Sequence, residues 1–405
     1  MTSTLSKTTP AVLSWRRVRN VVVLSLIVTL FFPMGNAALS GNISINNSGT
    51  ILYDALSPLH VEGPYIKNIF GQVVTLRGVD YSYFCDDPRG SWITRAGFVV
   101  WNSFDTIVMG DNLDAMRSWG ANIVRTPITI EWWTKNTYNF RSNIATWIVM
   151  AARRGMYVEI VPWRVSNATS FPELPYPPYN NGDPDTAIIG SVSAWVTFWA
   201  DMANTLKAYP SVLFELQNEP HGNATAKTSY FNAAQQVITA IRNTGSTNPI
   251  VFQWDYGVGA DIGNAWTNDM SWVTDNPLTD TTGNLIYSTH IYRNSFVDSR
   301  TPFHQLYTFD EMTDALNVTG VLSVAAQHPV YVGEIGCSLW SSDQSNEQAW
   351  YNNTLSIFNQ YAVSFSAWWW WSIGNQWGLY YSGAQLVPDY KPNQAGLILQ
   401  SKLSQ

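Results

Sequence analysis

Two glutamates in this sequence follow short apolar runs, a setting in which a carboxyl group can do acid–base chemistry. Glu219 lies in "LFELQNEPHG" (213–222), directly after residues that are typical of a buried strand. Glu334 lies in a second strand-like run, "VYVGEIG" (330–336). Two carboxyl groups about 5 Å apart can cleave a glycosidic bond, since one attacks the anomeric carbon and the other protonates the leaving oxygen. The two runs therefore predict this chemistry if the fold brings the glutamates together.

The elements that would position these glutamates are short strand-like runs alternating with longer helical patterns. Eight runs are rich in β-branched and aromatic residues: 73–80, 122–128, 157–163, 212–218, 250–255, 285–292, 330–336 and 365–372. Helical patterns lie near 111–120, 144–155, 192–208, 228–243, 310–326, 345–361 and 394–403. This alternation predicts an α/β fold, a (β/α)8 TIM barrel with a single catalytic domain. An open doubly wound sheet is the alternative, but no G-x-G-x-x-G follows the first strand.

In such a barrel the active site forms at the carboxyl ends of the strands. Polar and aromatic residues stand at these ends: Asp80, Arg125, Trp163, Asn218, Glu219, Trp254, Asp255, His290, Tyr292, Glu334 and the tryptophans at 368–371. We expect Glu219 and Glu334 to face each other across the mouth. Arg125 would lower the pKa of one of them, and a Trp-lined surrounding would raise the pKa of the other. Two buried glutamates that only satisfy hydrogen bonds are the alternative.

Six motifs, in this order along the chain, carry a resemblance: "LRGVDYSYF", "ANIVRTPI", "LFELQNEPHG", "STHIY", "VYVGEIG" and "WWWWS". They resemble the strand-end motifs of glycoside hydrolase family 5, the cellulase family of retaining (β/α)8 enzymes. The resemblance runs from roughly residue 60 to roughly residue 375. It implies an endo-β-1,4-glucanase that cleaves cellulose or related β-glucans by a two-glutamate double displacement, without a cofactor.

The resemblance also implies a role for each matching residue. Glu219 would be the general acid/base and Glu334 the nucleophile. Asn218 would bind the 2-hydroxyl of the reacting sugar, a contact that strengthens in the transition state. Arg125 and Tyr292 would hold the nucleophile ionised and oriented.

The remaining residues implied by the resemblance are His290, which would also lie at the site, and Trp371, which would lie under the −1 sugar. Trp369 would share a face with Trp371, because side chains alternate along a strand. Trp163 departs from the family pattern, since many members carry a His at this strand end. A Trp can stack on a sugar ring but cannot replace the hydrogen bonding of a His. Mannan, xyloglucan or a glycolipid as substrate, and a barrel that binds carbohydrate without catalysis, therefore stay open as alternatives.

The N-terminus has the pattern of a secretory signal peptide over residues 1–37, with a basic stretch, an apolar run and small residues before a cleavage site. An uncleaved membrane anchor is the alternative, and contact with a membrane is expected only in that case. Residues 38–50 read as a polar leader and 51–405 as the glycoside hydrolase catalytic domain. Asn-x-Ser/Thr sequons start at Asn42, Asn46, Asn167, Asn223, Asn317 and Asn352. We therefore expect a secreted, extracellular glycoprotein.

The composition narrows the partners. Charged residues make up 13% of the chain, the formal net charge is −7 and no basic run lies outside the N-terminus, which argues against nucleic acid. The chain has 20 Trp and 20 Tyr, whose rings suit the apolar faces of sugars. The resemblance implies a β-glucan or related polysaccharide as the partner, and we expect a monomeric protein. We expect no metal site, because H-E-x-x-H is absent. Cys85 and Cys337 are the only cysteines and could form one disulfide or remain buried thiols.

Overall fold

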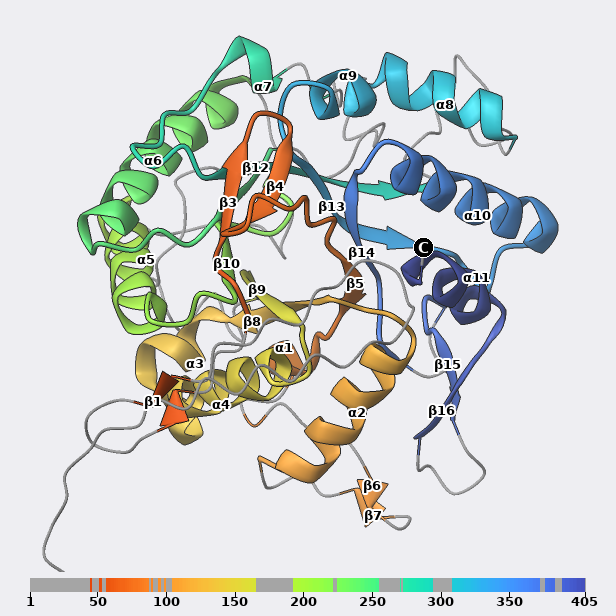
Figure 1. The fold of residues 1–405 in the computed structure, drawn as a ribbon, viewed down its shortest axis with the longest axis horizontal. Coiled ribbons are helices and arrows are strands. Elements are labelled where there is room, and N and C mark those ends of the chain that lie inside the picture. Colours follow the sequence, from red (N-terminus) through yellow and green to blue (C-terminus); the bar gives the residue numbers. More distant parts are fainter. Residues whose placement is uncertain are drawn as a thin grey trace, which may run out of the picture. The chain divides into compact units, whose positions relative to one another are not determined.

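The structure is a computed structural model of the full chain (Figure 1). It describes residues 56–86, 104–164, 192–220, 224–254, 272–293, 308–371, 376–382 and 388–404, four two-residue strands, and the single residues Arg89 and Met270. Residues 37–405 form one compact unit. The predicted signal peptide, all of the predicted leader except the two residues of one short strand, and the sequons at Asn42, Asn46, Asn167 and Asn223 lie outside the described residues.

Eight parallel strands close into a barrel, which confirms the predicted (β/α)8 fold. In chain order they are β5 (Arg77–Asp80), β8 (Ile123–Thr129), β9 (Tyr157–Arg164), β10 (Val212–Glu215), β11 (Ile250–Gln253), β12 (Leu285–Tyr292), β13 (Val330–Gly336) and β14 (Ser364–Ala367). Each strand pairs with the next one along the chain, and β14 pairs with β5 to close the ring. Each of the eight predicted runs overlaps one of these strands, and only β8, β9 and β14 extend beyond their runs, by one residue each.

Helices surround the barrel (Figure 1). Those of at least five residues are α2 (Thr106–Ser118), α3 (Ile130–Lys135), α4 (Phe140–Ala152), α5 (Val192–Leu206), α6 (Ala224–Asn243), α8 (Phe309–Val318), α9 (Val321–Ala325), α10 (Gln344–Gln360) and α11 (Gln394–Leu403). Shorter turns of helix are α1 (Tyr83–Asp86), a 3-10 turn at Thr137–Asn139 and α7 (Trp272–Asp275). The prediction of a single helix near 310–326 is wrong, because the structure has two helices there, α8 and α9. The division occurs at Gly320, which adopts a left-handed conformation with φ 80°.

Alternation along the strands divides the core into two layers. Phe214 of β10 packs with the helices in the outer cluster, whereas Leu213 belongs to an inner cluster with Ile123 and Val251 from other strands. Since successive strand residues point to opposite faces, Glu215 lies on the same inner side as Leu213. The barrel interior is thus apolar near the strand starts and becomes polar towards the strand ends.

A β-hairpin covers the amino-terminal end of the barrel. Its strands are β3 (Leu59–Glu62) and β4 (Tyr65–Asn68), and Leu59 and Ile66 belong to the inner apolar cluster. Asn284, just before β12, donates from its side chain to the carbonyl oxygen of Leu59. This end of the barrel is therefore closed, and the opposite end, where the strands terminate, is the one available for a site.

The remaining strands form small two-stranded sheets: β1 (Ser44–Ile45) with β2 (Ile51–Leu52), β6 (Thr94–Arg95) with β7 (Phe98–Val99), and β15 (Tyr380–Ser382) with β16 (Pro388–Pro392). Cys85 and Cys337 are both buried thiols and form no disulfide, so of the two possibilities for these cysteines the structure has the buried thiols. Within the described part of the chain, no helix combines the length and the apolar character needed to cross a bilayer.

Candidate active site

Glu219 stands just beyond β10, at the carboxyl end of the barrel. Its backbone has a positive φ of 45°, an uncommon conformation for a non-glycine residue, and its N–H donates to Gln253 Oε1 at 3.0 Å. Its side chain is 22% exposed, and Oε1 lies 2.7 Å from Nδ1 of His290. Glu219 therefore keeps contact with solvent while one carboxyl oxygen is held by a buried ring.

Glu334 lies within β13 and is far more enclosed, with a side chain that is 6% exposed. Its two oxygens have separate donors: Arg125 Nη1 donates to Oε1 at 2.7 Å, and the Tyr292 hydroxyl donates to Oε2 at 2.7 Å. Burial raises the pKa of Glu334, while Arg125 and Tyr292 act against that rise. The expectation that Arg125 lowers the pKa is thus correct for its own effect, but burial outweighs it.

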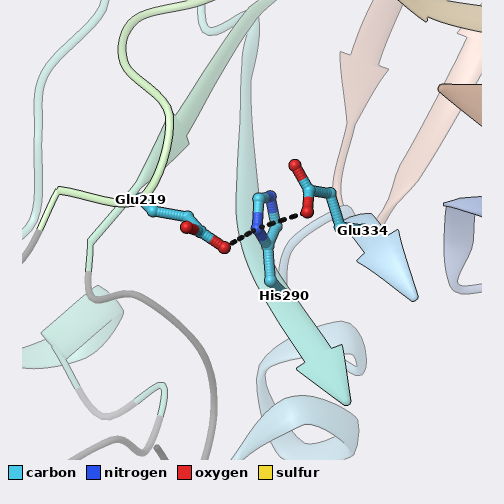
Figure 2. A group of neighbouring side chains, drawn as sticks. All are labelled: Glu219, His290 and Glu334. Carbon is cyan, nitrogen blue, oxygen red and sulfur yellow. Dashed lines mark hydrogen bonds and ion pairs between the residues drawn. The ribbon is translucent and has the colours of Figure 1, made fainter. Parts of the chain in front are cut away.

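His290 connects the two glutamates (Figure 2). Its Nδ1 is 2.7 Å from Glu219 Oε1 and 3.6 Å from Glu334 Oε2. One ligand-type atom from each of the three side chains lies within 4.8 Å of the others, so the two carboxyl groups come this close at their nearest oxygens. A retaining glycosidase needs carboxyl groups about 5 Å apart. The structure therefore brings together the two residues that the sequence singled out, at the separation that this chemistry requires.

The surroundings of His290 favour the neutral form of its ring. The side chain is fully buried, and burial together with the positive charge of Arg125 lowers the pKa of His290 well below its ordinary value. His290 and the two glutamates are also groups that can bind a divalent cation. Arg125, however, already donates directly to Glu334 and would repel a metal ion at this place. The arrangement therefore favours exchange of a proton between Glu219 and its surroundings over coordination of a metal.

Arg125 is the centre of a buried polar network inside the barrel. Its guanidinium, on β8, donates to Glu215 Oε2 at 2.6 Å, Glu334 Oε1 at 2.7 Å, Asn218 Oδ1 at 2.7 Å and Asp80 Oδ1 at 2.9 Å. The side chains of Arg125, Asp80 and Glu215 have no exposed surface. One cation thus orients the candidate nucleophile and the neighbouring amide at once.

Carboxyl groups outnumber cations in this network. Glu159 of β9 is also fully buried, and its Oε2 lies 3.8 Å from Arg125 Nε, beyond hydrogen-bond range. Burial raises the pKa of Glu159 well above its ordinary value, and the charge of Glu215 adds to this. Burial raises the pKa of Asp80 in the same way, against the effect of Arg125. Because one guanidinium cannot balance four buried carboxylates, part of this set holds protons.

Gly333 makes room for the network. A Cβ atom there would lie 3.0 Å from His290 Nε2, 3.2 Å from Ser288 Oγ and 3.4 Å from Arg125 Nε. These distances are tight for a methyl group surrounded by fully buried side chains. A glycine one residue before Glu334 is therefore required by the polar side chains that fill the barrel.

The aromatic residues at the mouth differ from the expectation in one position. Trp368 follows β14 directly, its N–H donates to the carbonyl of Ile335 beside Glu334, and its ring lies 5.3 Å from that of Trp163. Trp371 instead stacks on Tyr83, with ring centroids 4.8 Å apart. The strand ends at Ala367, so Trp368 is the tryptophan that directly follows the strand paired with β13.

The predicted pairing of Trp369 and Trp371 on one face agrees with their stacked rings, 4.7 Å apart with an interplanar angle of 4°. Trp163 is half-buried at the end of β9, as its place in the sequence predicted. Sequence reasoning missed Glu159, Glu215 and Gln253. The signal that would reveal them is a polar residue at an inward position of an otherwise apolar strand.

A closed parallel barrel that carries two glutamates, a histidine and a buried arginine at its carboxyl end defines the class of (β/α)8 hydrolytic enzymes. A family model for cellulase (glycosyl hydrolase family 5) matches residues 87–374. The chain therefore belongs to glycosyl hydrolase family 5, which confirms the resemblance.

Individual relatives are more distant. The chain is 24% identical to Endoglucanase E-5 of Thermobifida fusca over 273 residues, which cover 65% of this chain and 49% of that protein. It is 25% identical to Endoglucanase gh5-1 of Neurospora crassa over 205 residues, 48% of this chain and 46% of that protein. The chain thus spans about half the length of these relatives. The catalytic domain of the T. fusca endoglucanase Cel5A has the same fold, with a TM-score of 0.60 at 20% identity over 86% of this chain and 97% of that chain.

Proposed function

We propose that this chain is an endo-β-1,4-glucanase that hydrolyses cellulose or related β-glucans with retention of configuration. The observation that carries the proposal is the pair formed by Glu219 and Glu334, whose nearest carboxyl oxygens lie within 4.8 Å in two different environments. The relatives support the substrate class, since both are named endoglucanases and the T. fusca domain is described in complex with cellotetraose.

In the first step, a Glu334 oxygen attacks the anomeric carbon, and the bond from this carbon to the leaving oxygen breaks. Glu219 gives its proton to that oxygen, so the shortened glucan leaves as an alcohol and a glycosyl ester remains on Glu334. Arg125 and Tyr292 donate to the two oxygens of Glu334 and keep this carboxylate aimed at the site. Two charge-assisted hydrogen bonds also favour its ionised form.

In the second step, Glu219 acts as a base. It takes a proton from a water molecule whose oxygen attacks the anomeric carbon, and the ester bond to Glu334 breaks. The partial exposure of Glu219 suits this role, because water must reach it. Neutral His290 provides a hydrogen bond to Glu219 without fixing its charge, which suits a group that must be protonated in one step and ionised in the next.

The sugar would be held by the groups around this pair. Asn218 accepts a hydrogen bond from Arg125 with its Oδ1, so its Nδ2 amino group is the part that can donate to the 2-hydroxyl. We assign the ring under the −1 sugar to Trp368 in place of Trp371, because Trp368 follows the strand next to Glu334. Trp163, tilted by 57° against Trp368, would form a second wall and stack on the sugar where other family members donate a hydrogen bond.

The decisive experiment compares the parent with Glu334→Gln and Glu219→Gln on carboxymethyl cellulose, mixed-linkage glucan, mannan and xyloglucan. We expect hydrolysis of the β-glucans by the parent and a loss of at least about 10³-fold for Glu334→Gln. Proton NMR of the first product from a cello-oligosaccharide should show the β anomer, as retention demands. An α anomer, or turnover by Glu334→Gln equal to that of the parent, would contradict the mechanism.

We also infer that the chain is secreted and glycosylated, on the basis of residues 1–37 and the sequons. Two sequons fall on described residues: Asn317 is exposed near the end of α8, and Asn352 is partly exposed on α10. N-terminal sequencing of the protein from the culture medium should begin after Ala37. Recovery of the intact N-terminus in a membrane fraction would support the anchor instead.

A further inference from the structure

We propose that Trp340 is a stacking platform for a sugar residue of the glucan chain beyond the reacting pair, at a distal subsite on the catalytic face. The inference rests on the proposed function, because it takes a β-glucan as the ligand. It concerns how the enzyme holds a long chain, whereas the glutamates determine whether a bond is cleaved.

Trp340 is exposed to an unusual degree for its type. Its relative exposure is 68%, and every other tryptophan that the structure describes is buried or half-buried. A large flat ring in water contributes little to the core. The same ring is well suited to the apolar face of a sugar, as aromatic faces bind flat apolar surfaces with little loss of side-chain freedom.

The position of Trp340 is on the face where the strands end. It lies in the segment that follows β13, six residues after Glu334, so that at most about 20 Å of extended backbone separates the two. The hairpin β3–β4 covers the opposite end of the barrel. Trp340 is therefore within reach of a polymer that passes Glu334, yet outside the set of groups that contact the reacting bond.

The segment that carries Trp340 is held in place on both sides. The N–H of Ser338 donates to Glu347 Oε1 at 2.8 Å, and Gln344 Nε2 donates to the carbonyl oxygens of Ser338 at 2.8 Å and Ser341 at 2.9 Å. The N–H of Leu339, the residue before Trp340, donates to the carbonyl of Gln376 at 2.7 Å. A platform on a fixed turn binds with less ordering cost than one on a mobile loop.

The same segment is joined to the candidate nucleophile by packed rings. Gly336 has no room for a side chain, since a Cβ would lie 2.7 Å from Tyr292 Cε1 and 2.8 Å from Trp377 Cε3. The rings of Tyr292 and Trp377 lie 5.0 Å apart, and Tyr292 donates to Glu334. Trp340 and the nucleophile are therefore positioned by one continuous set of contacts.

The test uses Trp340→Ala, the conservative Trp340→Phe and the control Phe70→Ala. Phe70 is 55% exposed and lies two residues after the end of the β3–β4 hairpin, which covers the other end of the barrel. For each variant, kcat/KM is measured on cellotriose, cellopentaose and cellohexaose, together with the bond that is cleaved. We expect Trp340→Ala to lower kcat/KM about tenfold on cellohexaose and less on cellotriose, with a changed cleavage pattern. Trp340→Phe should retain most of the activity, and Phe70→Ala should match the parent.

Equal values for Trp340→Ala and the parent on cellohexaose would overturn the platform while leaving the proposed function intact. A uniform loss on all three oligosaccharides would also overturn it, since a general disturbance does not depend on chain length. If the parent cleaves none of them, the proposed function fails. In that case, calorimetric binding of cellohexaose to the parent and to Trp340→Ala tests the platform alone. We expect weaker binding by the variant, and equal binding would contradict the platform.

Discussion

Replacing Tyr292 by phenylalanine isolates one of the two hydrogen bonds that stabilise the ionised form of Glu334. The Tyr292 hydroxyl donates to Glu334 Oε2 at 2.7 Å, and the tyrosine is held protonated because burial and the charge of Glu334 raise its pKa well above the ordinary value. Tyr292→Phe removes this donor and keeps the ring that packs against Trp377. The change therefore acts on the hydrogen bond and leaves the packing in place.

The size of the effect follows from the charge on the acceptor. A hydrogen bond to a charged group contributes about 1.5–3 kcal/mol, and one pKa unit corresponds to about 1.4 kcal/mol. The pKa of Glu334, already raised by burial, should therefore rise by a further 1–2 units or so in the variant. Because the proposed nucleophile works in its ionised form, the acid limb of the pH profile should move to higher pH by this amount.

The assay is the pH dependence of kcat/KM on a soluble β-glucan for the parent and two variants. Tyr331→Phe is the matched control, since Tyr331 is also a fully buried tyrosine with a bonded hydroxyl, but its partners are Ser366 and Glu159. We expect the acid limb of Tyr331→Phe to stay within about 0.3 units of the parent. Thermal unfolding of both variants shows whether a loss of activity reflects a loss of folded protein.

An unchanged acid limb in Tyr292→Phe would refute this reasoning, because Glu334 would then not depend on Tyr292 for its charge. A shift towards lower pH would refute it equally. A lower plateau with an unmoved limb would assign Tyr292 to orientation only.

Three further predictions concern the buried groups. Glu159→Gln should raise the free energy of unfolding at pH 7 by about 1 kcal/mol or more and have no effect below about pH 4. An acid whose pKa is raised in the folded state costs stability only as the pH rises above its pKa in the unfolded state. Urea unfolding at both pH values measures this, and a larger gain at low pH would contradict it. Gly333→Ala should lower kcat at least about tenfold and the free energy of unfolding by about 1–3 kcal/mol, since the alanine methyl group would press on His290. Kinetics and a melting temperature equal to those of the parent would show that the barrel can adjust. Thiol titration of the denatured, unreduced protein should find both Cys85 and Cys337 reactive, and a reductant should leave the melting temperature unchanged. A titration that finds no reactive thiol would indicate a disulfide.

The barrel could be predicted because its strands are buried on both sides and separated by helices. Runs such as 285–292 and 330–336 coincide with β12 and β13 at both ends. The predicted strand 365–372 extends beyond the observed one, which ends at Ala367. Four consecutive tryptophans satisfy any strand pattern, so the sequence does not reveal where the chain leaves the sheet. The choice of Trp371 over Trp368 followed from that ambiguity.

The acid pair was recognisable for a related reason. Glu219 and Glu334 occupy strand ends, where all parallel strands present their residues to one face, so distant positions in the chain meet there. Their separation and the unequal exposure of 22% and 6% needed the structure, because both depend on how far each side chain extends into the barrel.

The buried network around Arg125 was the least predictable part of the site. Glu159 is the third residue of β9 and Glu215 the fourth residue of β10. A polar residue in a run such as "YVEIV" also fits a strand with one face in water. Only closure of the barrel turns this face into an interior, and closure depends on the pairing of β14 with β5 across most of the chain. Once the interior exists, four carboxyl groups share one guanidinium, and the charge of the proposed nucleophile depends on neighbours from five other strands. The protonation of Glu334 is thus a property of the closed barrel as a whole. Arg125 alone lowers the pKa of Glu334, but burial inside the closed barrel outweighs that effect and raises it.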